Sequence, residues 1–505
     1  MLATQRTNLL RWGMAGLLIT AFAIRAFTLT NQSLWRDEVD ALRFAIAPWR
    51  EMLGTFTQPG WNGPLYFVLL RGWVALTGQS EFALRYLSLF FGVLAVALAF
   101  GLSRRLTDSL TALLCSALFA TSPYLTWYSQ EVKMYSLVLA LAVLAVYALR
   151  RAIGHPEPQG GEGSRPCDKA TLRFRFAQND TTMGSSAGWW MTLVAATSIA
   201  MYCHILAALL IPVEMILALV WGIGSGNDGW WKGALVSFAC LTLPYLPLLR
   251  WQLPLVLTPA QTGFVFYPFN QMLMIMLSGF ATGVSGKLPT TALWPMGSLV
   301  LIGIALSPAR WRDKAVLLNW LLLPPLALFL ISLNRPIFTD RYLIWIGPAF
   351  YLLVSLGGVA VWRLWKPLGM VAFVAMVGIA MTGVYDQAAT PIKSDFRSAA
   401  RYVSAHQAPG DLVIFQIPYV RYTFDYYHPQ PYDWADGLFT NYGMSDADVD
   451  AQMWAMVAGR KTVWLVASEM EMWDRNLQVW KWLESHARRA DSVEFTLVTL
   501  YQYEF

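Results

Sequence analysis

Residues 82–102, FALRYLSLFFGVLAVALAFGL, form one long apolar run, and this stretch decides the fold. A helix of about 20 residues spans the roughly 30 Å hydrocarbon core of a bilayer. Met191–Val220 is a second such run. Over all 505 residues, 56% are hydrophobic and only 13% are charged, whereas soluble domains average about 25% charged residues. Because only helices satisfy their own backbone groups inside lipid, and no alternating strand pattern is visible, we expect a polytopic α-helical membrane protein.

Apolar runs recur along the chain and predict about eleven transmembrane helices. Leu9–Leu29 contains two arginines and is followed by no cleavage site, so it predicts an uncleaved anchor. The segment 64–78 has Arg71 at its middle, and we expect an interfacial helix there because a central arginine is costly in a spanning helix. The other spans are expected at 82–102, 108–122, 134–150, 189–203, 206–222, 232–250, 291–306, 315–332, 342–360 and 367–384.

Basic residues gather in the loops between alternate runs, which places those loops in the cytosol. The chain is then a multi-pass protein of the inner (plasma) membrane, with 31–81 as an outer loop. The stretch 151–188 is rich in Gly, Pro and polar residues and is expected to be a cytosolic loop. A transmembrane domain over 1–385 and an extracytoplasmic domain over 386–505 follow from this topology.

The composition changes near residue 386, where long apolar runs give way to shorter, mixed segments. Segments rich in Val, Ile, Phe or Leu predict strands, helical spacing predicts two helices, and Ser394 and Ser445 are their candidate caps. We therefore expect a small α/β domain, with strands at 411–417, 461–467 and 494–501 and helices at 394–406 and 446–458.

The formal charge of +6 does not indicate nucleic-acid binding, because the basic residues lie mostly in short loops beside the membrane. The four cysteines fall in expected spans or in the expected cytosolic loop, so no disulfide framework is predicted. A glycine-rich phosphate loop after a strand is absent from the sequence, which makes a nucleotide-sugar donor a weaker hypothesis.

Two adjacent acids, Asp37 and Glu38, follow the first span. Adjacent carboxylates at a membrane surface can supply a general base, a metal ligand or both. Acids also favour the first turn of a helix, and Ser33 could cap that helix, so a structural explanation stays open.

A second polar cluster, Ser122–Tyr135, joins two spans on the same outer side. Glu131 and Lys133 therefore lie near the membrane surface and can meet the loop that carries Asp37. A turn, a helix cap at Glu131 and aromatic anchors explain the same residues structurally.

A third cluster, Asn334–Tyr342, places Arg335 and Arg341 on the outer side, against the positive-inside trend. Arginine at this level suits a bound phosphate through its planar, multi-donor fork, but it can also snorkel to lipid headgroups. Arg25 near the outer end of the first span has the same two explanations. His204 has no partner spacing typical of a metal site and is expected to be structural.

Five stretches keep a fixed order over about residues 8–360, and together they resemble the GT-C glycosyltransferases of the protein O-mannosyltransferase and aminoarabinose-transferase group. The group often has His-Pro-Pro where this chain has Asn62-Gly63-Pro64, so a role for that histidine, including metal binding, is not carried over. The stretches that carry the resemblance are Leu34–Glu38, Gly63–Phe67, Ser80–Arg85, Ser122–Tyr135 and Arg341-Tyr342.

The resemblance implies a GT-C-like helical domain and a hexosyl or pentosyl transferase of the cell envelope. It implies a polyprenyl-phosphate sugar donor, an inverting single displacement, and an acceptor that is a protein, a lipid or a glycan. Membrane lipids are the other expected partners, and a divalent cation is the one cofactor considered. The implied roles are Asp37 as base, Glu38 and Glu131 as groups that orient the acceptor, the sugar or a cation, and Lys133, Arg341, Tyr342 and Arg25 as donor-phosphate ligands.

Two other classes of protein stay open. A transporter or flippase of lipid-linked saccharides would place polar groups or broken helices near the bilayer midplane, whereas the charges singled out above gather at outer loop ends. A non-catalytic envelope assembly subunit would tolerate substitution in the loops of Asp37 and Glu131.

Overall fold

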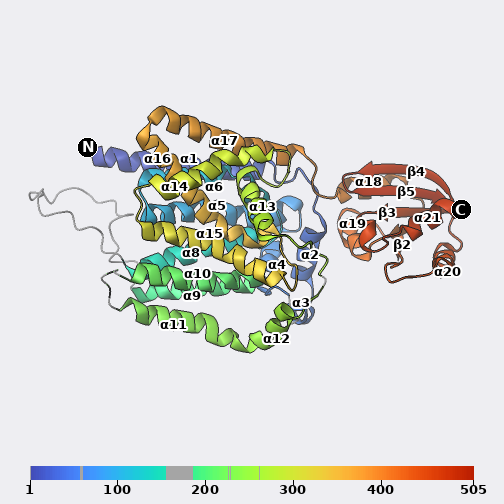
Figure 1. Cartoon of the computed structure of the whole chain (residues 1–505). Helices are drawn as coiled ribbons and strands as arrows, with labels where there is room; N and C mark the ends of the chain where they lie inside the picture. The colour runs from blue at the N-terminus through green and yellow to red at the C-terminus, as the bar shows by residue number, and fades with distance from the viewer. Residues whose placement is uncertain are drawn as a thin grey trace, which may run out of the picture.

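The computed structural model describes residues 2–56, 61–154, 186–223, 225, 227, 229–260 and 262–505. Most of the expected cytosolic loop at 151–188 lies outside these residues. The described chain forms a helical body and a smaller domain containing a β-sheet (Figure 1). The N-terminus lies at one end of the body and the sheet domain extends from the opposite end.

The body is all helical, and its elements follow the apolar runs of the sequence. In chain order they are α1 (Leu2–Phe27), α2 (Arg36–Ile46), α3 (Trp49–Phe56), α4 (Leu65–Thr77), α5 (Glu81–Leu106), α6 (Ser109–Thr121), α7 (Pro123–Tyr128), α8 (Tyr135–Ile153), α9 (Ser186–Cys203), η1 (Ile205–Leu209), α10 (Leu210–Gly222), α11 (Trp230–Thr242), η2 (Leu243–Tyr245), α12 (Leu246–Leu257), α13 (Phe269–Thr282), η3 (Thr290–Leu293), α14 (Trp294–Leu306), α15 (Trp311–Ser332), η4 (Asp340–Ile346), α16 (Gly347–Leu364) and α17 (Lys366–Ala389).

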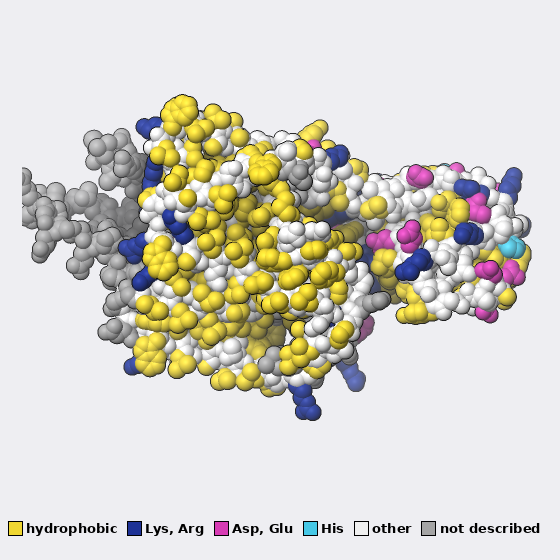
Figure 2. Space-filling model, in the orientation of Figure 1, with side chains coloured by type: hydrophobic (Ala, Val, Ile, Leu, Met, Phe, Trp, Pro, Cys, Tyr) yellow, Lys and Arg dark blue, Asp and Glu magenta, His cyan; other side chains and the backbone are white. Residues whose placement is uncertain are grey.

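Within the described residues, 7 helical stretches are long and apolar enough to cross a membrane, and the chain is an integral membrane protein. On the face of the helical body that Figure 2 shows, hydrophobic side chains predominate, while Lys and Arg side chains gather at the end that carries the N-terminus. Each expected span falls on helical residues, but the one expected at 232–250 is divided between α11, η2 and α12. The number eleven stays a prediction, because several of the helices are also short. The 7 stretches are Asn8–Phe27, Glu81–Leu106, Tyr135–Ile153, Ile205–Gly222, Trp311–Ser332, Asp340–Leu364 and Lys366–Ala389.

The segment expected to be interfacial is α4, which packs against α2 at the end of the body that faces the sheet domain (Figure 1). Its central Arg71 donates hydrogen bonds to the carbonyls of Ala45 and Ala47, at 3.1 and 2.6 Å. Carbonyls at a helix end lack partners within the helix, so Arg71 caps the C-terminal end of α2. The arginine thus has a protein partner at this end of the body and need not lie in lipid.

The C-terminal domain is a five-stranded sheet in the order β2-β1-β3-β5-β4. Strand β1 pairs in parallel with β2 and β3, and β5 pairs antiparallel with β3 and β4. Helices α18 and α19 contribute to the hydrophobic cluster on one face, and α20 and α21 to the cluster on the other. The elements are α18 (Phe396–His406), β1 (Leu412–Phe415), η5 (Pro418–Val420), α19 (Arg421–Tyr427), β2 (Asp433–Asp436), α20 (Asp446–Val457), β3 (Thr462–Ala467), η6 (Met470–Met472), α21 (Gln478–His486), β4 (Arg488–Phe495) and β5 (Val498–Glu504).

Most of the expected elements of this domain are present, but one predicted strand was wrong. The apolar segment 494–501 is a hairpin, in which β4 ends at Phe495, β5 begins at Val498, and Leu497 takes a positive φ of 55°. Ser445 caps its helix as expected, whereas Asp395, not Ser394, caps α18. Helix α17 runs to Ala389, four residues past the expected domain boundary at 385.

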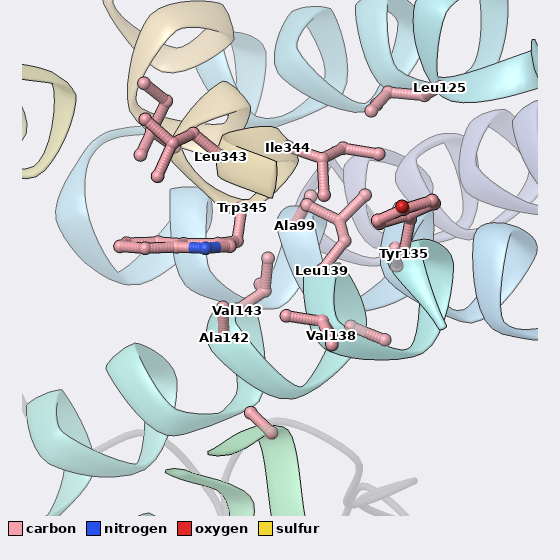
Figure 3. Close-up of a cluster of buried hydrophobic side chains, with 14 of the residues drawn as sticks. Ala99, Leu125, Tyr135, Val138, Leu139, Ala142, Val143, Leu343, Ile344 and Trp345 are labelled. Atoms are coloured by element: carbon pink, nitrogen blue, oxygen red, sulfur yellow. The ribbon is translucent and has the colours of Figure 1, made fainter. Parts of the chain in front are cut away.

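A buried cluster in the body places the third polar segment of the sequence. Figure 3 shows Leu343, Ile344 and Trp345 of η4 beside side chains of α8, including Val138 and Leu139. All five of these side chains are buried. This packing fixes η4 against α8, so that Arg341 and Tyr342, the second and third residues of η4, lie near the first residue of α8.

Candidate active site

Helix α2 presents Asp37 at the end of the body that faces the sheet domain. Its buried side chains, Val39, Leu42 and Ala45 among them, follow helical spacing and fix the face that packs inward. Asp37 lies in the first turn, where the helix dipole favours a carboxylate. The Oδ2 atom of Asp37 is 3.2 Å from Nη2 of Arg341, and its side chain is 20% exposed. The structure therefore joins the first and third polar clusters of the sequence.

Opposing effects set the pKa of the Asp37 carboxyl. Burial alone would raise the pKa of Asp37, but the positive charges of Lys133, Arg341 and Arg36 lower it below its ordinary value. The carboxylate is thus ionised at neutral pH and able to accept a proton. Its Oδ1 atom lies 3.8 Å from Nε of Arg36.

Two cations beside Asp37 retain unused hydrogen-bonding capacity. The Nε atom of Arg341 is buried and has no hydrogen-bond partner. The Lys133 ammonium has no hydrogen bond or ion pair to any side chain that the structure describes, and it is close enough to Asp37 to affect its pKa. The rings of Trp35 and Tyr135 flank the Arg341 guanidinium at 5.6 and 5.8 Å. An anion with several oxygens, such as a phosphate, matches this pair of cations.

Glu38 was expected to contact substrate or a cation. Its side chain is fully buried, and both of its carboxylate oxygens accept hydrogen bonds from other groups of the protein. Arg85 donates to both of its oxygens at 2.8 and 2.7 Å, and Lys393 donates to Oε2 at 2.9 Å. The backbone N–H of Val132 donates to Oε1 at 3.1 Å. Burial would raise the pKa of Glu38, but Arg85 and Lys393 lower it to about 2. This occupancy argues against direct contact with substrate and assigns Glu38 to holding α2 in place.

Glu131 lies beside this network with one oxygen unused. Its Oε2 atom is buried without a hydrogen-bond partner, and its Oε1 atom is 3.9 Å from Nζ of Lys393. Burial raises the pKa of Glu131, and Lys393 opposes that rise without cancelling it. A buried carboxylate oxygen is costly unless a donor reaches it. A hydroxyl group that reached Oε2 would satisfy it; the role of Glu131 in orienting a substrate stays a prediction.

Tyr342 and His204 form an aromatic wall next to Arg341, with ring centroids 4.9 Å apart. The turn that carries His204 is supported by the stretch at which the sequence departs from His-Pro-Pro. Asn62 accepts a hydrogen bond from the N–H of Ile205 at 3.1 Å. A Cβ atom on Gly63 would lie 2.2 Å from the carbonyl oxygen of Tyr202, so only glycine fits there. In this chain the stretch supports the turn; a role of Tyr342 in phosphate binding stays a prediction.

Arg25 was expected to bind the donor phosphate, but in the structure its guanidinium is hydrogen-bonded to other parts of the protein. Its side chain is fully buried. It donates hydrogen bonds to the carbonyls of Phe119 and Ala120 at 3.0 and 2.9 Å, and to Oγ of Ser129 at 3.2 Å. These bonds fasten α1 to the end of α6. These contacts give Arg25 a role in joining two helices, and its binding of the donor phosphate stays a prediction.

Two residues of the charged network were not assigned a role from sequence. Arg85 lies within an expected span, where a charge is costly unless it has partners inside the protein. Lys393 follows the last span on the outer side, against the positive-inside trend. Both signals were present in the sequence, but neither indicates the partner, which is Glu38 in each case.

The divalent cation has no evident donor set. Over the residues that the structure describes, no three His, Cys, Asp or Glu side chains gather in a way that could hold a metal ion. The binding of a divalent cation stays a prediction.

The comparisons with known proteins bear on the fold. ArnT from Cupriavidus metallidurans in the apo state superposes over 99% of this chain and 98% of its own, with a TM-score of 0.59 and 14% identity. The chain has the GT-C fold. The same ArnT bound to undecaprenyl phosphate matches with a TM-score of 0.56, 12% identity, and 97% coverage of both chains.

Two further matches cover a smaller part of one of the two sequences compared. An oligosaccharyltransferase of Archaeoglobus fulgidus, AglB, in complex with an inhibitory peptide and a dolichol-phosphate, matches with a TM-score of 0.56 and 11% identity over 91% of this chain and 70% of its own. A family model described as dolichyl-phosphate-mannose-protein mannosyltransferase matches residues 59–161. No curated protein matches the sequence. The GT-C fold thus agrees with the expected fold class, including the C-terminal α/β domain.

Proposed function

We propose that this protein is a membrane glycosyltransferase that moves a hexosyl or pentosyl group from a polyprenyl-phosphate donor to an acceptor hydroxyl at the outer face of the inner (plasma) membrane. The observation that carries the proposal is the meeting of Asp37 with Arg341 and Lys133. One ionised carboxylate and two cations with unused donors suit a reaction that removes a proton on one side and releases a phosphate on the other. The GT-C fold and the lipid phosphates bound by ArnT and AglB support the donor class.

The proposed reaction is a single displacement. The acceptor oxygen forms a bond to the anomeric carbon as the bond from that carbon to the phosphate oxygen breaks. The acceptor proton passes to Asp37, and the electron pair of the broken bond leaves with the lipid phosphate. Arg341 and Lys133 stabilise the growing negative charge on that phosphate. The configuration at the anomeric carbon is inverted because attack and departure occur on opposite faces.

The ion pair between Arg341 and Asp37 couples donor binding to base strength. In the structure without donor, Arg341 and Lys133 hold the pKa of Asp37 below its ordinary value, and a carboxylate of low pKa is a weak base. A donor phosphate that shares these cations reduces their effect on Asp37. The proton affinity of Asp37 then rises only when the substrate is in place.

Transport of lipid-linked saccharides is the alternative from another class, and it needs polar groups along a path through the bilayer. Glu214, a buried acid in α10, accepts a hydrogen bond from Thr197 of α9 at 2.8 Å. That contact joins two neighbouring helices. The charged network described above lies instead at the end of the body near the sheet domain, where an acceptor outside the membrane would arrive.

The test is transfer of radiolabelled sugar from polyprenyl-phosphate donors in membranes that contain the wild type, Asp37→Asn or Asp40→Asn. Asp40 lies one turn further along α2 and pairs with Arg43 at 3.2 Å, so it is a matched control. Asparagine keeps the size of the side chain but cannot accept the proton. Asp37→Asn should be slower by about 10²- to 10⁴-fold, the usual loss on removing a general base, while Asp40→Asn keeps most of the rate.

The outcomes separate the competing functions. Equal transfer by the wild type and Asp37→Asn, at equal abundance, would move the base to another residue, with Glu131 the next to be tested. If the wild type transfers neither hexosyl nor pentosyl groups from any donor, the enzyme proposal fails and transport or assembly takes its place.

A further inference from the structure

The segment between α17 and the sheet domain is fixed to the first outer loop by one side chain. The amide nitrogen of Gln32 donates to the carbonyls of Gln387 and Thr390, both at 3.0 Å. Its amide oxygen accepts from the N–H groups of Ile392 and Lys393, both at 2.9 Å. A single glutamine thus uses both ends of its amide to set the backbone that presents the Lys393 side chain.

The Lys393 side chain turns inward and is almost completely buried. Its ammonium is 2.9 Å from Oε2 of Glu38 and 3.9 Å from Oε1 of Glu131, and it lies 5.1 Å from the ring centroid of Trp127. Burying an ammonium is costly unless opposite charges surround it. Here Lys393 and Arg85 together balance the two carboxylates. Lys393 therefore bridges the acid that fixes α2 and the acid that has an unused oxygen.

The sheet domain also holds α2 from the outside. Arg36, directly before Asp37, pairs with Glu469 at 3.4 Å and lies 4.8 Å from the ring of Tyr419. About two helical turns further along α2, the Arg43 guanidinium lies 3.1 Å from the centroid of the Tyr422 ring. Contacts from the domain thus reach both ends of the short helix that carries the proposed base.

A second set of bonds closes the same interface beside α5. Arg397 of α18 pairs with Glu81 through two hydrogen bonds of 3.0 and 2.7 Å. The hydroxyl of Tyr427 donates to the same carboxylate and accepts from the N–H of Leu34 at 2.6 Å. The loop that leads into α2 is therefore bonded directly to the C-terminal domain.

From these contacts we propose that the C-terminal domain and its linker complete the active site, with Lys393 as a positioning residue that holds Glu38 and Glu131 in their working places. The inference rests on the proposed glycosyltransferase function and extends it. Lys393 touches neither donor nor acceptor. It fixes α2 through Glu38 and places a positive charge 3.9 Å from Oε1 of Glu131, beside the substrate hydroxyl.

The charge of Lys393 also acts on the pKa of Glu131. Burial raises the pKa of Glu131, and Lys393 opposes that rise. Removing the lysine therefore raises this pKa further, so the ionised form is lost at a higher pH as the solution is acidified. The other groups that face Glu131 are Glu38 and Asp37 of α2, Arg341 of η4, and the phenols of Tyr66, Tyr128 and Tyr135.

The test compares full-length Lys393→Met, Lys393→Arg and wild type for sugar transfer across pH. Lys461→Met, at an exposed site on the sheet domain, is the matched control. Lys393→Met should lower kcat by about 10- to 100-fold, as expected on losing a residue that orients groups of the active site. KM for the donor should change little, and the acid limb of the rate profile should move to higher pH. Lys393→Arg keeps the positive charge, so the acid limb of its rate profile should lie at the same pH as that of the wild type.

Each outcome decides between a positioning role and a merely structural one. A Lys393→Met protein with the wild-type rate overturns the inference, and so does one that is slower with an unshifted acid limb. If Lys393→Met does not accumulate, Lys393→Arg decides alone: an abundant arginine variant whose limb lies away from that of the wild type overturns it. An inactive wild type would instead refute the proposed function, so the two failures are distinguishable.

Discussion

Replacing Arg85 by methionine should destabilise the protein far more than its single charge suggests. All the nitrogens of the Arg85 guanidinium donate within the protein: two bonds go to Glu38, and the others go to the carbonyls of Leu29, Gln32 and Ser33 at 2.8, 2.7 and 3.0 Å. Methionine fills much of the same volume but donates nothing. The substitution therefore leaves a buried carboxylate short of one partner and three carbonyls without a donor.

The magnitude follows from these contacts. Breaking a buried ion pair costs about 3–5 kcal/mol, and the lower figure applies because Glu38 keeps Lys393. The lost bonds to carbonyls add about 0.5–1.5 kcal/mol each. We expect a loss of about 5 kcal/mol in total. The matched control is Arg363→Met, which removes the exposed pair with Asp108, whose Oδ2 atom lies 2.8 Å from Nη2 of Arg363, and should cost about 1 kcal/mol, as surface pairs do.

The assay is thermal unfolding of the purified proteins in detergent, followed by intrinsic tryptophan fluorescence and by the fraction that remains monodisperse after heating. Arg85→Met should unfold at a clearly lower temperature than Arg363→Met, and the unfolding temperature of Arg363→Met should lie close to that of the wild type. Equal unfolding temperatures for the two variants would refute the reasoning, because they would mean that the network around Glu38 contributes no more than a surface pair.

Further predictions concern the site and the topology. Arg341→Lys keeps the charge but loses the guanidinium fork, so kcat should fall by about 10²-fold and KM for the donor should rise in steady-state transfer assays; an unchanged kcat would exclude Arg341 from the leaving-group site. Arg341 acts to lower the pKa of both Asp37 and Glu131, so its charge helps both carboxylates to stay ionised on acidification; Arg341→Gln should move the acid limb of the rate profile to higher pH, and an unmoved limb would mean that the charge of Arg341 acts on neither carboxylate during catalysis. Reporter fusions after Arg105 and after the C-terminal Phe505 should report opposite sides of the membrane, and the same side for both would refute the predicted topology.

The spans were predictable because a bilayer demands long apolar helices, and such runs are visible without any knowledge of their neighbours. The boundaries of the strands in the sheet domain were harder to predict. Residues 494–501 have the composition of one strand, and the turn within them occurs at Leu497, a residue that does not signal a left-handed conformation. Sequence reasoning had no local sign that the strand doubles back.

The site divides in the same way. Asp37, Lys133 and Arg341 could be proposed as one group because each lies at the outer end of a predicted span. The protein partners of Arg25 and Glu38 could not be predicted, since a charged residue at such a position looks the same in the sequence whether its partners are substrate atoms or groups of the protein. Lys393 was missed because its partner, Glu38, is 355 positions away along the chain.

That separation has a consequence for biogenesis. The ribosome makes Glu38 and Arg85 early, and the spans on either side of Glu38, α1 and α5, can enter the bilayer while most of the chain is still unsynthesised. Lys393 emerges only after the last apolar helix has been translated. A nascent chain can therefore acquire its membrane anchorage long before its acidic network is neutralised, and a messenger that ends after α17 would yield an inserted protein whose catalytic loop is left unfinished.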